Sequence, residues 1–344
     1  MIQIKATTVT PLCQIRNSED EVVNQKKITV IKPMKQKVML ANSKGTLTSF
    51  ETPIYSGNGF RGKLRRAALE IMLEKAKNDN IKISTMDFHL MNAGGGNLFQ
   101  AQSFETIKEV RGINPLVSLF GASLAIPGKI ITPNLMPYRS ITDVLEYYTH
   151  ETEEGHVFST IITSDKNRDQ FITSDDMLLG KGNARFVTEE QIIEWELMAG
   201  ENQTARAKAR NSEDTDTKKV KKETMKSFLS RDYVIRGVDF YTGLRPMPTC
   251  EFTTLEYGML IRALERVVVT NLGSNVARNF GLMKYAIDFH GGSELETDIN
   301  AYGEAKIVKL NYKGLEKEAV ECFDAWLEND FSQETLEISQ KLKN

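Results

Sequence analysis

Two strongly amphipathic helical patterns, far apart in the sequence, constrain the fold most. The first runs from Gly62 to about Lys77 and gathers Leu64, Ala68 and Met72 on one face. The second opens at Thr253, which forms a capping-box pattern with Glu256, and continues through the apolar segment TLEYGMLIRALERVVVTN. Each apolar face needs a surface to pack on, and the segments before, between and after the helices have the alternation of strands.

The order of these elements predicts an α+β fold, with two helices packed on one sheet. An RRM-like or ferredoxin-like βαββαβ palm fits this order, which is strand, helix, strands, a long polar interruption, strand, helix and strand. We expect one domain over residues 1–344, enlarged by helical and hairpin insertions at 78–112 and 142–232. Within the second insertion, residues 201–226 carry eight Lys and Arg residues and almost no large apolar ones, which predicts a mobile basic arm.

Composition narrows the class of protein. The chain has 344 residues and 40% apolar content, enough for a sizeable core. Its three cysteines lie far apart without metal-ligand spacing, which argues against a disulfide framework or a zinc ribbon. The first residues lack the pattern of a secretory signal, and no apolar run approaches the ~20 residues that span a membrane. We therefore expect a soluble cytoplasmic protein with no membrane contact.

Charge is segregated along the chain, although the net charge is only −2. The stretch from Val22 to Phe50 contains no Asp or Glu, whereas the C-terminal stretch from Leu315 is rich in acid. Six lysines occupy the first stretch: Lys26, Lys27, Lys32, Lys35, Lys37 and Lys44.

The segment PIYSGNGFRGKLRR spaces three glycines as G-x-G-x-x-G immediately before the first helix. A Rossmann dinucleotide site would need a buried parallel strand before it, and FETPIYS is a poor candidate. Glycines at a helix N-terminus nevertheless suit an anion, and a polynucleotide backbone would use many cations. A plain turn with a solvated basic helix remains the alternative. The candidate residues are Gly57, Asn58, Gly59, Arg61, Lys63, Arg65 and Arg66.

A second loop of the same kind, GSNVARNFG, supplies Arg278 and Asn279, and NAGGGN at 92–97 is a third glycine-rich turn. RNFGLMKY also partly matches the RNP1 pattern of RNA-binding sheets. We expect its aromatic residues, Phe280 and Tyr285, to be core residues rather than a base-stacking platform.

Catalytic and cofactor patterns are missing from the sequence. The four histidines lack metal-ligand spacing, and no G-x-S-x-G or Walker A sequence occurs. We therefore predict no metal site, no cofactor and no enzymatic activity.

Three stretches resemble the RAMP superfamily of CRISPR-associated proteins, and within it the Cas-seven-type backbone subunits. PIYSGNGFRGKLRR is similar to the family's glycine-rich motif before the first helix. INPLVSLFGAS, at 113–123, resembles its "LFG" segment, and LGSNVARNFGLMKY resembles its late glycine-rich loop. Together they cover about a ninth of the chain directly.

This resemblance implies an RRM-like palm with helical fingers and a thumb, whose copies stack helically along a guide RNA (crRNA). It implies guide-phosphate contacts by Gly59, Arg61, Lys63 and Arg65, with Arg278 and Asn279 in the same groove. Lys26, Lys27 and Lys37 are further candidates, either for this groove or for the side that faces the target. The implied partners are crRNA, a target nucleic acid with DNA favoured, copies of the chain and other effector subunits.

Two departures from the family pattern matter. RNA-cleaving relatives carry an aspartate upstream of the glycine motif, where Val22 to Phe50 has none, so we expect no cleavage. Asn279 replaces a usual glycine of the late loop. The sequences GNGFRGKLRR and NAGGG resemble those of type IV systems, so the resemblance favours that type. The alternatives are an RNA-processing endoribonuclease of the same superfamily and, less favoured, a dinucleotide-binding oxidoreductase.

Overall fold

The computed structural model describes residues 1–23, 26–41, 47–94, 100–122, 125–137, 172–179, 227–274, 276–289 and 291–342. Within these ranges the chain divides into two compact units. The first comprises the described parts of 1–15, 33–173 and 233–344, and the second those of 16–32 and 174–232. The predicted basic arm at 201–226 and the turn residues 95–97 lie outside the described residues.

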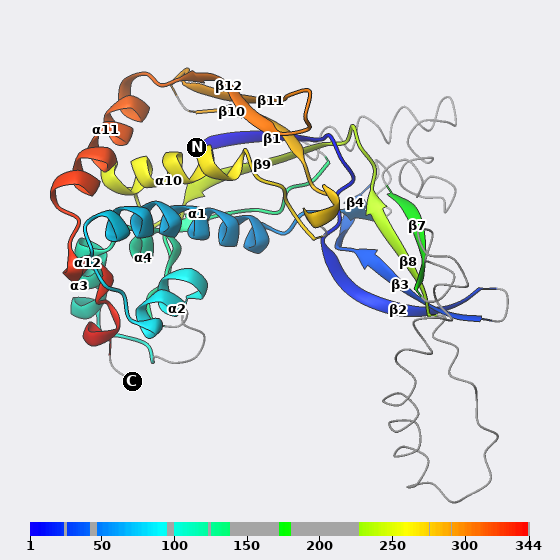
Figure 1. Ribbon diagram of the computed structural model, residues 1–344, viewed down its shortest axis with the longest axis horizontal. Coiled ribbons are helices and arrows are strands. Elements are labelled where there is room, and N and C mark those ends of the chain that lie inside the picture. Colours follow the sequence, from blue (N-terminus) through cyan, green and yellow to red (C-terminus); the bar gives the residue numbers. More distant parts are fainter. Residues whose placement is uncertain are drawn as a thin grey trace, which may run out of the picture. The chain divides into compact units, whose positions relative to one another are not determined.

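The first unit is built on a six-stranded antiparallel sheet (Figure 1). Strand β1 is central in it and pairs with β10 on one side and β9 on the other. The sheet order is β12 (Ala305–Asn311), β11 (Glu294–Ile299), β10 (Met283–Asp288), β1 (Ile2–Thr8), β9 (Asp239–Pro246) and β6 (Ile130–Ile131).

The connections confirm the predicted α+β palm. Helix α1 (Gly57–Asn78) comes between β1 and β6, and α10 (Thr254–Val267) comes between β9 and β10. The neighbours β10, β1, β9 and β6 are thus the fourth, first, third and second strands of a βαββαβ unit, which is the ferredoxin-like order. Strands β11 and β12 extend this sheet beyond β10.

Both helices lie against the same face of the sheet, side by side in Figure 1. Side chains alternate along β1, so that Ile2, Ile4 and Ala6 are buried while Gln3 is exposed. The apolar face of α1 joins the same core, because its side chains Phe60, Leu64, Ala68 and Met72 are fully buried. The predicted apolar stripe of this helix is therefore its packing face.

Helix α11 (Gly314–Asn329) packs closely on α10. A Cβ atom at Gly258 would lie 2.0 Å from the backbone oxygen of Ala319, so only glycine allows this approach. At the start of α10, Thr253 and Glu256 form the predicted capping box.

Of the remaining helices of the first unit, α2 (Thr85–Ala93) and α4 (Pro115–Phe120) pack on α1, and α4 also contacts α10. Residues 78–112, the expected helical insertion, contain α2 and α3. The other bounds are α3 (Phe104–Ile113) and α12 (Gln333–Leu336), with short 3-10 turns at Val276–Arg278 and Ser339–Lys341. Strands β4 (Lys35–Ala41) and β5 (Leu47–Pro53) form a two-stranded antiparallel ladder.

The second unit contains a four-stranded sheet in the order β2 (Ile15–Val23), β3 (Lys26–Pro33), β8 (Ser227–Val234) and β7 (Ile172–Leu179). Strands β3 and β8 pair in parallel. Much of the expected insertion at 142–232 lies outside the described residues, and its assignment as thumb or fingers stays a prediction.

Candidate nucleic-acid interface

Three segments that are distant in sequence meet at the start of α1. Gln14 binds Ser56 through both amide atoms: its Nε2 donates to Ser56 Oγ at 2.7 Å, and its Oε1 accepts from Ser56 N at 2.6 Å. The loop 271–281 is attached to the same N-terminal segment, because Ser274 N donates to Cys13 O at 2.8 Å. The first and the late glycine-rich segments therefore lie on one surface.

The first glycine segment is helical rather than a loop, which corrects the expectation that α1 begins at Gly62. Ser56 is the N-cap, and its Oγ accepts from Gly59 N at 3.0 Å. Asn134 Oδ1 accepts from Gly57 N at 2.8 Å. Two amide groups of the first turn, which were candidates for an anion, are thus bonded within the protein.

Close packing accounts for two of the three glycines. A Cβ atom at Gly57 would lie 1.9 Å from Thr132 O, and one at Gly59 would lie 2.8 Å from Gln14 Nε2. At Gly62 the nearest atom would be Arg66 Nη1 at 3.5 Å, which is ordinary contact. At the first two glycines of the G-x-G-x-x-G spacing, other segments of the protein therefore pack close to the backbone of α1.

The late loop keeps the backbone conformation that its glycines suggest. Gly273, Asn279 and Gly281 have φ angles of 81°, 59° and 78°. Asparagine tolerates the left-handed region better than other non-glycine residues, so Asn279 in place of a glycine preserves the turn. At Gly281 a Cβ atom would lie 1.6 Å from Leu272 O, so the loop closes tightly on itself.

Lys63 connects α1 to this loop. Its Nζ donates to Asn271 O at 2.9 Å. The side chain of Asn271 continues the chain of contacts by donating to Asn279 Oδ1 at 3.1 Å and to Phe280 O at 3.0 Å. The structure therefore brings together Lys63 and Asn279, two residues predicted from separate motifs.

Cations on α1 lie close enough to affect one another. Burial, and next the charge of Arg66, lower the pKa of Lys63, whereas Glu70 acts in the opposite direction. Neither Arg61 nor Arg66 has an ion pair with any carboxylate of the described residues. We call Arg61, Lys63 and Arg66 the basic cluster.

Arg65 departs from the expected phosphate contact. It is only 8% exposed, and its Nη2 donates to Phe120 O at 2.5 Å and to Gly121 O at 2.8 Å. Burial, together with the charges of Arg61 and Arg66, lowers its pKa to about 10. Its guanidinium holds the C-terminal end of α4, so it binds the "LFG" segment of this protein instead of facing solvent.

The other predicted residues are placed less completely. Asn58 is exposed on the first turn of α1, and Lys37 is exposed on β4. Lys26 and Lys27 belong to β3 and Arg278 to the 3-10 turn, but their side chains lie outside what the structure describes.

Sequence reasoning missed the polar residues that organise this surface. They are Gln14, Tyr55, Ser56, Asn134 and Asn271. Ser56 had a readable signal, since serine directly before a helical segment is a favoured N-cap. Tyr55 is 3% exposed; burial raises the pKa of its hydroxyl, whereas a hydrogen bond to the Gly273 backbone and the charge of Arg66 act against this. Gln14, Asn134 and Asn271 bond across long sequence separations, which no local pattern shows.

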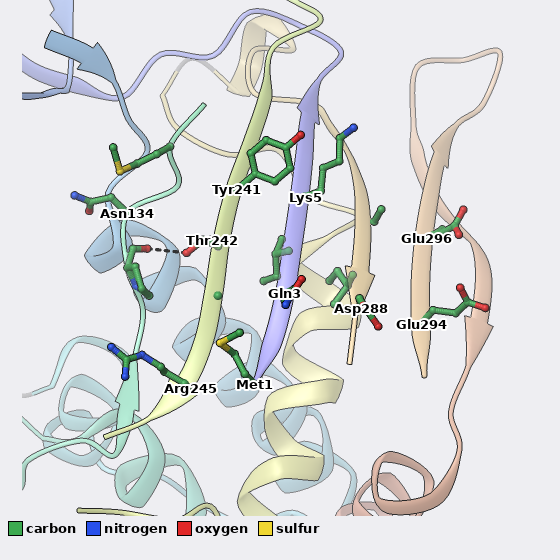
Figure 2. A pocket seen from close by; sticks show the side chains of 16 residues that line it. Met1, Gln3, Lys5, Asn134, Tyr241, Thr242, Arg245, Asp288, Glu294 and Glu296 are labelled. Carbon is green, nitrogen blue, oxygen red and sulfur yellow. Dashed lines mark hydrogen bonds between the residues drawn. The ribbon is translucent and has the colours of Figure 1, made fainter. Parts of the chain in front are cut away.

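The open face of the palm sheet is a second concave surface, with a hollow of about 910 Å³ (Figure 2). Charged side chains of both signs line it, with three carboxylates (Asp288, Glu294 and Glu296) and two cations (Lys5 and Arg245). Its Lys5 pairs with Asp239 at 2.7 Å, and Lys309 pairs with Glu294 at 2.9 Å. Because these carboxylates repel phosphate and neutralise the nearby lysines, the basic cluster is the better candidate for a polyanion.

The aromatic residues of RNFGLMKY do not form a base-stacking platform on the sheet. Tyr285 is 1% exposed in the core, which confirms the prediction for it. Phe280 is half-buried, and its ring lies against that of Tyr233, with centroids 5.3 Å apart.

Within the described residues, no group of three or more His, Cys, Asp or Glu side chains is arranged to hold a metal ion. None of the described helices is both long and apolar enough to cross a membrane.

Comparisons with known proteins find similarity among solved structures. No protein-family profile and no curated protein sequence matches the chain. Among solved structures, it is similar to a chain of one described as a "Type IV-B CRISPR Complex", with 10% sequence identity and a TM-score of 0.42 over 92% of this chain and 96% of that one. At this level of similarity, function has to be argued from the residues.

Proposed function

We propose that this protein is a non-catalytic, guide-RNA-binding backbone subunit of a CRISPR effector complex, of a type IV system. Copies of it stack along the crRNA and present the guide to a target nucleic acid, with DNA favoured, alongside other effector subunits. The family resemblance of the three motifs supplies these finer features. The RNA-binding part of the proposal has its own support in the basic cluster.

The observation that carries the proposal is the meeting of two basic glycine-rich segments on one surface. The charge of Arg66 acts on Lys63, and Arg61 and Arg66 both act on Arg65. Neither Arg61 nor Arg66 has a carboxylate partner among the described residues, and Lys63 donates to Asn271 of the late loop. Such cations repel one another, and a bound polyanion relieves the repulsion by neutralising them. A phosphodiester chain supplies regularly spaced charges that match this need without any requirement for base sequence.

The sheet argues against the dinucleotide alternative. A Rossmann site needs parallel strands, with the glycines between a central strand and its helix. Here the palm strands pair antiparallel, and the glycines follow β5, which belongs to a two-stranded ladder. The oxidoreductase interpretation is therefore wrong about the fold.

The endoribonuclease alternative gains no specific support. Of the four histidines, the structure describes only His89, on α2, where its ring lies 5.6 Å from that of Phe88. Incubation with a repeat RNA tests this alternative directly. A discrete cleavage product formed by the purified protein would contradict the non-catalytic proposal.

RNA binding is tested with two labelled single-stranded RNAs of unrelated sequence, measured by fluorescence anisotropy. The double variant Arg61→Gln/Arg66→Gln removes two cations without altering the core, and we expect weaker binding to both RNAs by the same factor, on the order of tenfold or more. The matched control is Arg245→Gln, since Arg245 is exposed on the open sheet face (Figure 2).

Unchanged affinity in the folded double variant would contradict the proposal. Loss of binding in Arg245→Gln alone would instead place the RNA on the open face of the sheet. Purified protein that carries nuclease-sensitive material, with excess absorbance at 260 nm over 280 nm, is the expected companion result.

A further inference from the structure

An exposed tyrosine stands beside the candidate RNA surface. Tyr302 occupies the turn between β11 and β12, and it is 90% exposed, more than any other exposed large hydrophobic residue of the described chain. A single exposed aromatic residue needs no explanation by itself. Two further observations about Tyr302 point to a ligand: its turn is rigidly hydrogen-bonded, and this turn lies near the late glycine-rich loop.

The turn is fixed by one asparagine. Asn300 Oδ1 accepts from Tyr302 N and from Glu304 N, both at 2.9 Å, and Asn300 Nδ2 donates to Glu304 Oε2 at 3.0 Å. Backbone bonds close the same turn, from Asn300 N to Glu304 O and from Gly303 N to Asn300 O. The backbone that carries Tyr302 is thus held in place before any ligand binds, which lowers the entropy cost of binding.

This turn lies against the late glycine-rich loop. A Cβ atom placed on Gly303, the neighbour of Tyr302, would lie 3.8 Å from Asn279 Nδ2. Asn279 in turn accepts from Asn271, whose carbonyl accepts from Lys63. The basic cluster, the late loop and the turn of Tyr302 are therefore successive neighbours.

We propose that Tyr302 stacks on an unpaired base of the RNA whose phosphates the basic cluster binds. This rests on the proposed function and adds a ligand class to it, a single strand with accessible bases. Tyrosine combines a large apolar ring with few rotatable bonds, and every base offers a π-face, so the contact is independent of sequence. Bases inside a duplex are already stacked and are not available to such a residue.

The test uses Tyr302→Ala and Tyr302→Phe with two probes, a single-stranded RNA and an abasic ribose-phosphate strand of equal length. We expect Tyr302→Ala to weaken binding of the RNA about tenfold, within the range for base–aromatic stacking. Binding of the abasic strand stays unchanged, and Tyr302→Phe keeps the affinity of the wild type for both. The control is Phe104→Ala, since Phe104 is 74% exposed on α3.

Each outcome separates this inference from the function that it extends. If Arg61→Gln/Arg66→Gln weakens RNA binding but Tyr302→Ala does not, only the stacking inference fails. If the wild type binds no RNA, the proposed function fails as well. An equal loss on both probes, or a changed oligomeric state of Tyr302→Ala without RNA, would make Tyr302 a structural or subunit contact and overturn the inference.

Discussion

Gly57 and Gly62 belong to the same sequence motif but have different surroundings. We predict that Gly57→Ala destabilises the protein by ~1–3 kcal/mol, because its Cβ would meet Thr132 O at 1.9 Å. Gly62→Ala meets only the Arg66 side chain, so it should raise stability by up to ~1 kcal/mol through helix propensity. Chemical denaturation of both variants measures this. A loss of RNA affinity in folded Gly62→Ala would instead give this glycine the role of admitting phosphate.

Arg65 and Arg66 are adjacent, and we predict opposite phenotypes. Arg65→Met removes the donor of two hydrogen bonds to the end of α4 and should lower the free energy of unfolding by ~1.5–3 kcal/mol. Arg66→Met removes an exposed cation and should change stability by less than ~0.5 kcal/mol while weakening RNA binding. Paired denaturation and anisotropy measurements check both effects. If Arg65→Met weakened RNA binding and Arg66→Met lowered stability, the basic cluster would have been chosen wrongly.

The sequence could predict that cations gather at this helix, but not which of them face solvent. Helical periodicity places position 65 beside Ala68 and Leu69, both buried, so an arginine there is expected to face the interior. Whether an arginine is tolerated there depends on carbonyl partners from α4, 55 and 56 residues away in sequence. Long-range partners of this kind also explain why Gln14, Asn134 and Asn271 were missed.

At the scale of elements, α10 and α11 pack closely at Gly258. We predict that Gly258→Ala lowers the free energy of unfolding by ~1–3 kcal/mol, because its Cβ would lie 2.0 Å from Ala319 O and the helices would have to separate. The control is Gly112→Ala on α3, where a Cβ meets nothing within 4 Å and helix propensity favours alanine. Equal stability of the two variants in thermal or chemical unfolding would contradict this account of the packing.

Elements with strong local signals were predicted well. The capping box of Thr253 and Glu256 is present, as predicted. The start of α1 was misplaced by five residues, because glycines suggested a loop where Ser56 caps a helix. Strand β11 was missed since ELETDI is rich in acid; it is held by antiparallel pairing with β10 and β12.

At the scale of the whole molecule, the order of helices and strands sufficed for the palm. Two amphipathic helices and the strands around them admit few arrangements, and the ferredoxin-like order is one that satisfies both apolar faces. The extension of the sheet by β11 and β12 and the composition of the second unit depend on pairing between distant segments. Periodicity along the chain contains no information about such pairing.

The account as a whole depends on whether the basic cluster neutralises phosphates. The most direct measurement is the salt dependence of single-stranded RNA binding, for the wild type and for Arg61→Gln/Lys63→Gln/Arg66→Gln. Each lost phosphate contact should flatten the slope of log Kobs against log salt by ~0.7, so the triple variant should lose about 2 in slope. An unchanged slope in the folded triple variant would contradict the claim that these three cations bind the RNA backbone.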